Sequence, residues 1–497
     1  MFQQNVKLLL IPAVLYCLCT SQLGLAKATS SPQPLRNDLL EDGQFIHIPG
    51  PNPILITGQK GSWEDDCIET ADAFKDFDTY YLYYHATSKE AGFRLGVAIS
   101  KHPLGPFKKY EGNPVLELGS KGTWDDRYVA CAMVMKIPEN PKLKPGEGGW
   151  DGWEYDKYYM WYSAVGSSPE HKPWGVGLAT ASNPLGPWKR YEGNPVVEGD
   201  FGFVGGVVQV DGKFYLYSAS PLHSIGQDYS PMSMAVADSP EGPWKKYEGN
   251  PVMLPGNKGE WDDGGFSEAE VLYHSGIFHM FYGGAKLYKP RIATRESIGY
   301  AYSFDGFNWI KYGLNPVAPR DANPNASAFA EIHAIWDAPF IYLYHTHRYK
   351  ESWEIGGFKR IVPDAEDIGV QVLATQRPFS LDMPVLNLES LGAGKTSLLD
   401  DCPPVCLSNV SRLSLTAECA YSKNAAKPII VHIRSSYDGV KYDTFDLYTL
   451  EVPLLSGKTA RKTIRLEPDY RFIKVMVENL DKKESVSDVK IVATLGG

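Results

Sequence analysis

The phrase PLGPFKKYEGNPV at residues 103–115 decides the fold, because it returns with two changes at residues 184–196 and with two changes at residues 240–252. In both later copies a tryptophan replaces the phenylalanine. A degenerate fourth copy occupies residues 305–317, and Asn-Pro also occurs at residues 52–53. Recurrence of this kind is typical of repeat architectures, and Asn-Pro and Pro-Gly pairs mark turns. The chain therefore consists of similar units that are separated by turns.

Each unit carries the same strand signals between its turns. An aromatic strand appears five times, at residues 80–84, 158–162, 214–217, 278–282 and 341–344. A strand of small and apolar residues follows in four units, at residues 95–98, 176–179, 234–237 and 298–301. Such strands suit packed antiparallel sheets. Five units of about 55–80 residues, each with about four strands, predict a five-bladed β-propeller at residues 45–385, whereas a solenoid normally uses repeats of about 20–45 residues.

The repeat ends after Val385, and the remaining sequence has a different pattern. Residues 386–404 are typical of a linker, with glycines near residue 393 and Pro403-Pro404. Residues 405–497 contain short alternating strands, which predict a small β-sandwich. The predicted fold class is therefore all-β, with a five-bladed β-propeller followed by a small C-terminal β-sandwich.

The first 28 residues have the pattern of a secretory signal peptide. Lys7 precedes an apolar run, and Ala26-Lys27-Ala28 fits a cleavage site. The run is too short for the alternative, a membrane anchor, which needs about 20 apolar residues. The sequence therefore predicts a protein that is secreted, extracellular or, in a bacterium, periplasmic, with no membrane association.

Composition and charge exclude several classes of protein. Among 497 residues there are 49 Lys and Arg against 59 Asp and Glu, a formal charge of −10. This acidic balance argues against nucleic acid as a partner, because such a surface needs clustered basic residues. With 43% hydrophobic and 22% charged residues, the chain is globular rather than disordered or collagen-like. The oligomeric state is left open. Three cysteines near one another, Cys402, Cys406 and Cys419, predict one local disulfide.

The innermost strands of a propeller line its central channel, so alignment of the units indicates which side chains meet there. Trp63, Trp124 and Trp261 anchor an alignment without gaps. One register then contains Thr70, Cys131, Val204, Glu268 and Glu331. A second, two residues on and on the same strand face, contains Asp72, Met133, Gly206, Glu270 and His333. The corner before these strands contains Asp65, Asp126 and Asp263, followed by Asp66, Arg127, Asp200 and Gly264. Acids in a shared channel must be solvated, paired or functional.

Structural explanations compete with functional ones at each of these positions. Recurring Gly-x-Trp-acid-Asp segments also fit turn caps that bind backbone N–H groups, and this explanation is favoured for Asp125 and Asp262. It stays open for Asp65, Asp66 and Asp126. Glu268 differs from its counterparts in three units, which favours function. Glu331 and His333 fit either a functional site or a buried salt bridge that closes the channel.

The five units, the inner-strand acids and the Tyr-Tyr-Leu-Tyr strand resemble the five-bladed propeller glycosidases, in particular glycoside hydrolase family 43 and the related family 117. In family 43 an acid Glu opens the inner strand of the fourth blade, so the resemblance implies this role for Glu268. A general-base Asp followed by Pro opens the first blade's inner strand, where this chain has Asp65, Asp66 and Asp72 without the Pro. The family's third Asp, in blade three, has no clear match, and Asp200 or Asp126 is the substitute.

The first functional hypothesis is an inverting glycosidase that acts on a plant- or algal-type polysaccharide or its oligosaccharides. This reaction needs one protonated carboxyl and one carboxylate, about 6.5–9.5 Å apart. We assign Glu268 as acid and Asp66 as base, with Asp65 in reserve, and Asp126 or Glu331 as the neighbour that keeps the acid protonated. Arg127 and His333 would hold substrate hydroxyls or an acidic substituent, and Glu270 and Asp72 would complete the substrate site.

The second hypothesis is a non-catalytic glycan-binding or adhesion propeller, since one fold hosts many functions. A phosphorylase is a third, which would need a basic phosphate pocket. No phosphate-binding glycine loop or dinucleotide fingerprint occurs, so no nucleotide cofactor is expected. No specific metal site is predicted, and Ca²⁺ or Na⁺ in the channel is the one cofactor left open.

Overall fold

The computed structural model describes residues 45–88, 91–138, 156–168, 174–199, 201, 203–219, 231–289, 292–320, 328–348, 353–354 and 366–497. The predicted signal peptide and Asp200 lie outside these residues. Regular structure in the described residues is almost entirely β, with one short 3-10 helix, η4 (Leu399–Asp401). No helix in this part of the chain is long and apolar enough to cross a lipid bilayer.

Five antiparallel sheets form the blades of a ring, and each blade is numbered here from the N-terminus. Blade 1 consists of β2 (Cys67–Asp76), β3 (Thr79–Ser88), β4 (Ala91–Ser100) and β5 (Lys108–Lys109). Blade 2 consists of β6 (Tyr128–Pro138), β7 (Asp156–Val165), β8 (Gly175–Ala181) and β9 (Lys189–Arg190). Blade 3 consists of β10 (Phe203–Val210), β11 (Lys213–Ala219), β12 (Met232–Ala237) and β13 (Lys245–Lys246).

The last two blades follow the same plan with additions. Blade 4 consists of β14 (Gly265–His274), β15 (Ile277–Lys289), β16 (Ile292–Ser303) and β17 (Ile310–Lys311), and β20 (Trp353–Glu354) also pairs with β16. Blade 5 consists of β18 (Ala328–Asp337), β19 (Phe340–Arg348), β21 (Glu366–Ala374) and β1 (Ile46–Pro49). Its outer strand therefore comes from the start of the described chain.

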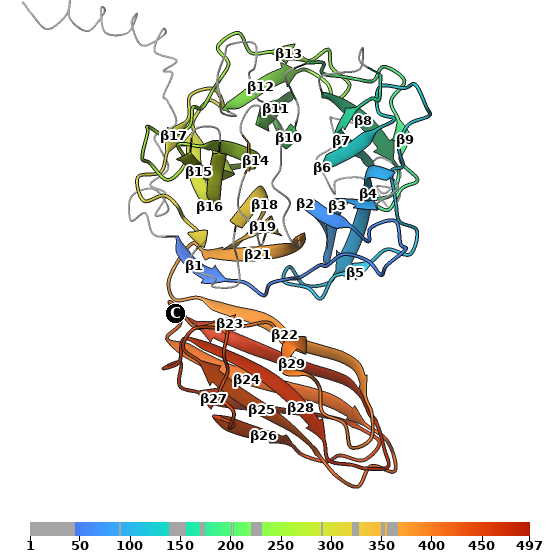
Figure 1. The fold of residues 1–497 in the computed structure, drawn as a ribbon, viewed down its shortest axis with the longest axis vertical. Coiled ribbons are helices and arrows are strands. Elements are labelled where there is room, and N and C mark those ends of the chain that lie inside the picture. Colours follow the sequence, from blue (N-terminus) through green and yellow to red (C-terminus); the bar gives the residue numbers. More distant parts are fainter. Residues whose placement is uncertain are drawn as a thin grey trace, which may run out of the picture. The chain divides into compact units, whose positions relative to one another are not determined.

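The blades close into a ring around one axis, as the repeat predicts (Figure 1). The first strand of each blade, called its inner strand below, contacts the inner strands of both neighbouring blades, and β18 of blade 5 contacts β2 of blade 1. β1 fastens the ring, since Ile46 pairs with Ala374 and Pro49 with Gln371 across blade 5. Side chains that are distant in sequence consequently meet at the axis.

Apolar side chains pack between neighbouring blades. Tyr83 and Val97 of blade 1 belong to one buried cluster with Val134 and Met160 of blade 2. The inner strands therefore contribute apolar side chains to the packing between blades. This packing holds the channel side chains on a rigid frame.

A repeated polar lock explains the Gly-x-Trp-acid segments. In blade 1, Tyr84 stacks on Trp63 and donates its hydroxyl to Glu64, which also pairs with Lys109 at 2.9 Å. Blades 2 and 4 repeat the lock with the sets Trp124, Tyr162, Asp125 and Arg190, and Trp261, Tyr282, Asp262 and Lys311. Asp125 and Asp262 are thus structural, although their partners are a cation and a tyrosine rather than the backbone of a turn.

In blades 1, 2 and 4 the Asn of the Asn-Pro pair completes the same lock. Asn113 accepts a hydrogen bond from the Val97 N–H and donates to the Val97 carbonyl and to the Tyr84 hydroxyl. Asn194 and Asn315 bind their own blades in the same way. The Asn of the repeated phrase therefore binds the outer turn of a blade to the backbone of its third strand.

Lys311→Met should destabilise the fold by about 2–3 kcal/mol, because Asp262 is only 1% exposed and would lose its cation at 2.6 Å. Urea unfolding measures this change. Lys245→Met on β13, at an exposed position, is the matched control and should stay within about 0.5 kcal/mol of the parent. Equal stability of the two variants would show that the lock contributes nothing.

Two further four-stranded sheets follow the ring. One has the order β22 (Ser380–Leu391), β29 (Val486–Gly496), β24 (Arg412–Tyr421) and β27 (Thr459–Leu466). The other has the order β23 (Val405–Cys406), β28 (Phe472–Asn479), β25 (Ile429–Ser436) and β26 (Tyr448–Val452). Both sheets contribute buried residues, such as Leu415 and Val475, to one apolar cluster.

The boundary between the ring and these sheets differs from the predicted one. β22 begins at Ser380 and pairs with β29, so the C-terminal sheets start before the predicted linker of residues 386–404. The reason is that blade 5 takes its outer strand from β1, so the chain needs one strand fewer before it leaves the ring.

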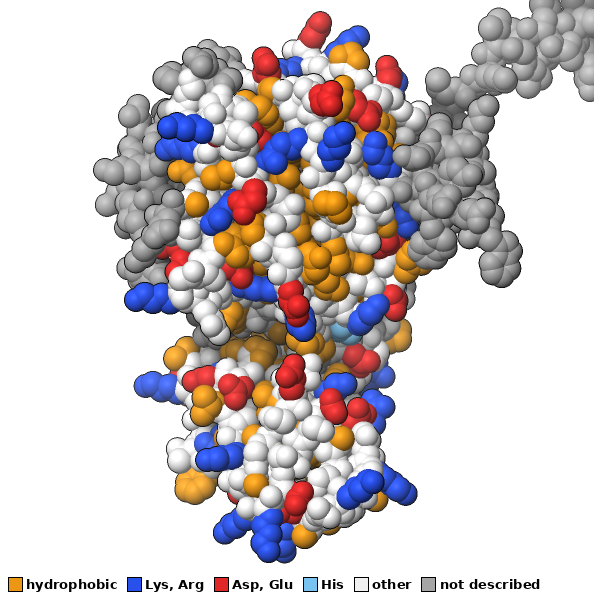
Figure 2. All heavy atoms as spheres, turned by 90° about the vertical axis from the view of Figure 1, so that its right-hand side faces the viewer, with side chains coloured by type: hydrophobic (Ala, Val, Ile, Leu, Met, Phe, Trp, Pro, Cys, Tyr) orange, Lys and Arg blue, Asp and Glu red, His pale blue; other side chains and the backbone are white. Residues whose placement is uncertain are grey.

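The expected local disulfide is absent, since Cys402, Cys406 and Cys419 are not joined to one another. Cys402 and Cys406 instead contact Pro403 and Ser408. On the face shown in Figure 2, basic and acidic side chains are interspersed, and no broad patch of one sign appears.

Candidate functional site

The first halves of the inner strands carry the polar side chains of the channel. The pairing of every inner strand with its neighbour has a bulge, between Glu69 and Asp72, Ala130 and Met133, Val204 and Val207, Phe266 and Ala269, and Ala330 and His333. Bulges re-aim side chains and are common beside active sites. At three of them Thr70, Cys131 and Glu331 have φ values of 44°, 47° and 58°, in the left-handed region that costs a non-glycine residue energy.

Three glutamates from three blades surround one thiol, and we call Glu69, Cys131, Glu268 and Glu331 the carboxylate cluster. The three glutamates are 5%, 6% and 6% exposed. The Cys131 thiol lies 3.5 Å from Glu268 Oε1. Burial, followed by the charges of Glu268 and Glu331, raises the pKa of the Cys131 thiol well above its usual value, and the charge of Glu69 adds to this. The thiol therefore stays protonated and donates to Glu268.

Two groups contact the Glu69 carboxylate. The Cys67 thiol donates to its Oε1 at 2.8 Å, and His85 Nε2 lies 3.9 Å from its Oε2. His85 Nδ1 accepts the Cys131 N–H at 3.2 Å, so the proton of the neutral ring is on Nε2 and faces Glu69. His85 thus joins blade 1 to blade 2 at the cluster.

Glu331 is fixed by hydroxyl groups from its own and the neighbouring blade. The Thr346 hydroxyl donates to the Glu331 carboxylate and accepts the Thr70 N–H at 2.8 Å. The Glu331 N–H donates to Ser267 Oγ at 2.9 Å. The cluster is therefore braced by blades 1, 4 and 5, which limits the movement of its carboxylates.

A second group, which we call the buried triad, consists of Asp72, Glu270 and His333. The three residues are at most 2% exposed. His333 Nδ1 lies 3.5 Å from Asp72 Oδ1 and 3.4 Å from Glu270 Oε2, and these are ion-pair distances rather than short hydrogen bonds. Asp72 also accepts the Val134 N–H at 2.8 Å, and Glu270 accepts the Val271 N–H at 3.0 Å.

The positive charge of His333 and the negative charges of the two acids compensate one another. Burial lowers the pKa of His333, but the nearby carboxylates of Asp72 and Glu270 outweigh it and raise this pKa to about 10. Burial raises the pKa of Glu270 to about 7, against the opposing effect of His333. The imidazole is consequently a cation at neutral pH and compensates the acids beside it.

The ligand atoms of the triad lie within 4.8 Å of one another, so their fit to a cation can be tested. Ca²⁺ takes six to eight oxygen ligands. The triad supplies carboxylate oxygens from only two residues and one imidazole nitrogen, fewer oxygen ligands than Ca²⁺ takes. These residues therefore do not fit Ca²⁺, and no step below uses a metal.

The predicted corner acids Asp65 and Asp126 form turns. Asp65 Oδ2 accepts the Gly61 N–H at 2.6 Å, and Asp126 accepts the Gly122 N–H at 2.6 Å and the Ser167 N–H at 2.5 Å. Asp263 of blade 4 repeats this with Gly259 and Leu287. Their carboxylates are used by the backbone, so the structural alternative explains them.

Asp66 and Arg127 lie at the outer ends of inner strands and are exposed. Asp66 is the residue before β2, and its backbone N–H donates to Thr87. The Arg127 guanidinium lies 5.0 Å from the centre of the Tyr128 ring. Neither side chain belongs to the carboxylate cluster or the buried triad.

The structure brings together Glu268 with Glu331, and Asp72 with Glu270 and His333, as the two predicted registers imply. It adds Glu69, Cys131, Cys67 and His85, to which sequence reasoning assigned no role. Glu69 precedes a predicted channel residue by one position and would face away in a regular strand. The bulge after it cancels that alternation. The sequence signal for this placement of Glu69 is the group of polar residues inside β2, in the segment from Ile68 to Asp72.

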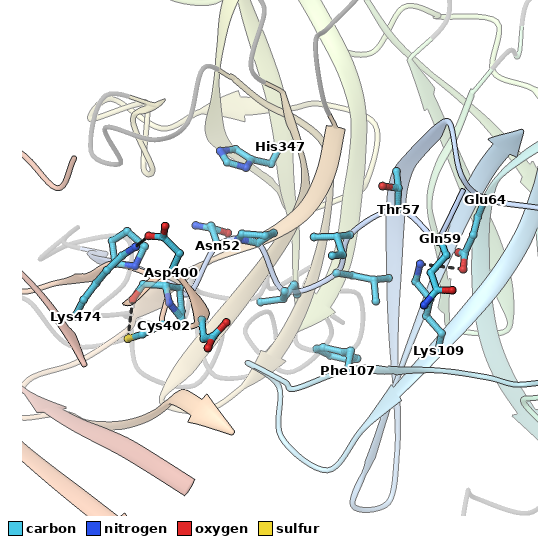
Figure 3. Close-up of a pocket in the computed structure, with 18 residues that line it drawn as sticks. Asn52, Thr57, Gln59, Glu64, Phe107, Lys109, His347, Asp400, Cys402 and Lys474 are labelled. Carbon is cyan, nitrogen blue, oxygen red and sulfur yellow. Dashed lines mark hydrogen bonds and ion pairs between the residues drawn. The ribbon is translucent and has the colours of Figure 1, made fainter. Parts of the chain in front are cut away.

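A cavity of about 1050 Å³ lies elsewhere (Figure 3). It is lined by the segment 52–59, by Phe107 and Lys109 of blade 1, by Asp400 of η4 and the following Pro403, and by Lys474 of β28. The paired side chains at its wall, such as Lys474 with Asp400 at 2.9 Å, already satisfy each other. No member of the carboxylate cluster lines this cavity.

Several solved structures are similar to the chain. A thermostable family-43 glycoside hydrolase has a TM-score of 0.44 and 20% identity, covering 65% of this chain and 91% of that chain. A family 117 glycoside hydrolase from Zobellia galactanivorans has a TM-score of 0.40 and 15% identity, covering 67% and 90%. A member of the GH130 family of mannoside phosphorylases, which contains glycoside hydrolases that target β-1,2-mannosidic linkages in Candida mannan, has a TM-score of 0.43 and 16% identity, covering 67% and 95%.

No family model matches the chain. No curated protein matches it either. The resemblance to families 43 and 117 that the residues indicated is thus found again among solved structures, but at TM-scores below 0.5 it carries no weight for the activity of this chain.

Proposed function

We propose that the protein is a secreted glycoside hydrolase, that it inverts the anomeric centre, and that its substrate is a plant- or algal-type polysaccharide or its oligosaccharides. The observation that carries this proposal is the carboxylate cluster, in which Glu69, Glu268 and Glu331 from three blades surround one thiol at the channel. The signal-like residues 1–28 support secretion.

Glu268 is the general acid in this proposal. Three carboxyl groups with little contact with water cannot all be ionised at low cost, so the cluster retains a proton. The Glu331 carboxylate accepts the Thr346 hydroxyl, so in this proposal Glu268 is the member of the pair that carries the proton. Transfer of this proton to the glycosidic oxygen lets the C–O bond break and the leaving sugar depart as an alcohol.

Glu69 is the general base in this proposal. The donors Cys67 and His85 face its carboxylate and stabilise its negative charge. It would take a proton from a water molecule that attacks the anomeric carbon from the opposite side, which inverts the configuration. Asp66, the exposed residue directly before the same strand, is the base expected from the sequence. The rates of Asp66→Asn and Glu69→Gln show which of the two residues is the base.

A panel of neutral polysaccharides and oligosaccharides tests the activity by release of reducing ends, with and without inorganic phosphate. We expect release without phosphate, and proton NMR should show the inverted anomer first. Binding without release would instead identify a glycan-binding propeller. Release that requires phosphate would identify a phosphorylase, and the initial appearance of the retained anomer would contradict the inverting mechanism.

A further inference from the structure

Four aromatic rings from three blades form a continuous row, which we call the aromatic row: Phe93, Tyr128, Trp174 and Phe203. The ring centres of Phe93 and Tyr128 are 5.6 Å apart, those of Tyr128 and Trp174 are 5.8 Å apart, and those of Trp174 and Phe203 are 5.1 Å apart. The planes of Tyr128 and Trp174 differ by only 9°. All four side chains are half-buried. The four residues therefore lie at the edge of the apolar core and are not fully enclosed by it.

The row lies at the end of the ring that holds the carboxylate cluster. Tyr128 and Phe203 are the first residues of inner strands β6 and β10, and Tyr128 precedes Cys131 by three positions. Trp174 directly precedes β8, whose start pairs with the end of β7 and thus lies beside the start of β6. His85 links the row to the cluster, since its ring centre is 4.4 Å from that of Phe93 and its Nδ1 accepts the Cys131 N–H.

Aromatic faces carry partial negative charge and attract the partially positive C–H groups of a sugar ring while they exclude water from it. Binding sites are commonly lined by aromatic side chains with a few polar groups that fix orientation. The neighbouring carboxylates disfavour anionic sugars by charge repulsion. Arg127, whose guanidinium lies on Tyr128, is a cation beside the row.

We propose that the aromatic row is a subsite that stacks successive neutral sugar residues of a chain beside the bond that is cleaved. The inference rests on the proposed function and deepens it, because it makes an oligomeric neutral glycan, rather than a single small glycoside, the preferred substrate. Trp174 is the central ring of the subsite, because it contacts both Tyr128 and Phe203.

Trp174→Leu tests the subsite, because leucine keeps apolar bulk and removes the ring. The measured quantity is the ratio of kcat/KM for a neutral oligosaccharide of five residues to kcat/KM for the 4-nitrophenyl glycoside of the same sugar. We expect this ratio to fall about tenfold, the effect of one aromatic contact. Trp174→Phe should restore most of it.

Phe74→Leu is the matched control. Phe74 is also half-buried and also contacts a ring of a neighbouring blade, Tyr158 of blade 2, but it lies toward the other end of β2. Its ratio should equal that of the parent. An equal ratio in Trp174→Leu and the parent would overturn the inference, as would an equal fall in both leucine variants.

Titration of the same pentasaccharide into Glu268→Gln, by calorimetry, separates this inference from the proposed function. Binding that weakens about tenfold when Trp174→Leu is added supports the subsite even if the parent protein hydrolyses nothing, in which case the proposed function fails alone. Hydrolysis by the parent with binding that does not depend on Trp174 overturns the subsite alone. No hydrolysis and no binding of any neutral pentasaccharide overturn both.

Discussion

Glu268→Gln should lower the rate of hydrolysis of an unactivated oligosaccharide by about 10²–10⁴-fold, because the amide cannot transfer a proton to the leaving oxygen. Glutamine retains the size of the side chain and an oxygen that can accept from the Cys131 thiol at 3.5 Å. The fold should therefore be unchanged. Initial rates of reducing-end release, together with the urea midpoint, measure both effects.

A substrate with a good leaving group separates an acid from a residue that only supports the site. Nitrophenolate departs with little protonation, so the loss for a 4-nitrophenyl glycoside should be much smaller than for the oligosaccharide. Glu331→Gln is the matched control, because it removes a neighbouring charge and leaves the proton donor in place. It should displace the pH–rate profile and retain activity. Equal losses on both substrates in Glu268→Gln would remove the assignment.

Much of the ring could be predicted because the repeated residues have the same structural role in each copy. The Trp, Tyr and Asn of the polar lock recur in blades 1, 2 and 4, and the aromatic strands extend the alignment to blades 3 and 5, so the aligned units place their inner strands in register. This is why Glu268 was placed with Glu331, and Asp72 with Glu270 and His333. Only the repeat period was needed, not the identity of any ligand.

The remaining parts depend on contacts that a single unit does not reveal. The alternation of a regular strand predicts that Glu69 faces away from Thr70 and Asp72, and only the bulge between them alters this. Asp65 and Asp126 look like channel acids because they precede the inner strands, yet nearby backbone N–H groups bind them. The closing strand β1 lies outside the repeat and was not predicted.

His333→Gln should destabilise the fold by about 3–5 kcal/mol, the effect of leaving buried acids without their cation. Asp72 and Glu270 are 1% and 2% exposed, so water cannot replace the imidazolium. Glutamine has a similar size, so a cavity contributes little to the loss. Urea unfolding at neutral pH measures the change in the free energy of unfolding.

The same triad predicts how stability depends on pH. The pKa of His333 is raised from 6.5 to about 10 on folding, so the folded protein binds this proton more tightly than the unfolded chain. The stabilisation is complete below about pH 6.5 and is lost as the pH rises toward 10. The raised pKa of Glu270, about 7, acts with the same sign at lower pH. The free energy of unfolding should therefore fall from pH 7 to pH 10, and less steeply in His333→Gln.

A variant with no charge in the triad tests whether charge, rather than shape, causes the loss. Asp72→Asn and Glu270→Gln combined with His333→Gln keep the side-chain volumes and remove all three ionisable groups. Because uncharged groups need no cation, this triple variant should recover most of the stability that His333→Gln alone loses, with little dependence on pH above 7. A triple variant as unstable as the single one, or a single variant within about 1 kcal/mol of the parent, would show that the imidazolium does not hold this part of the channel together.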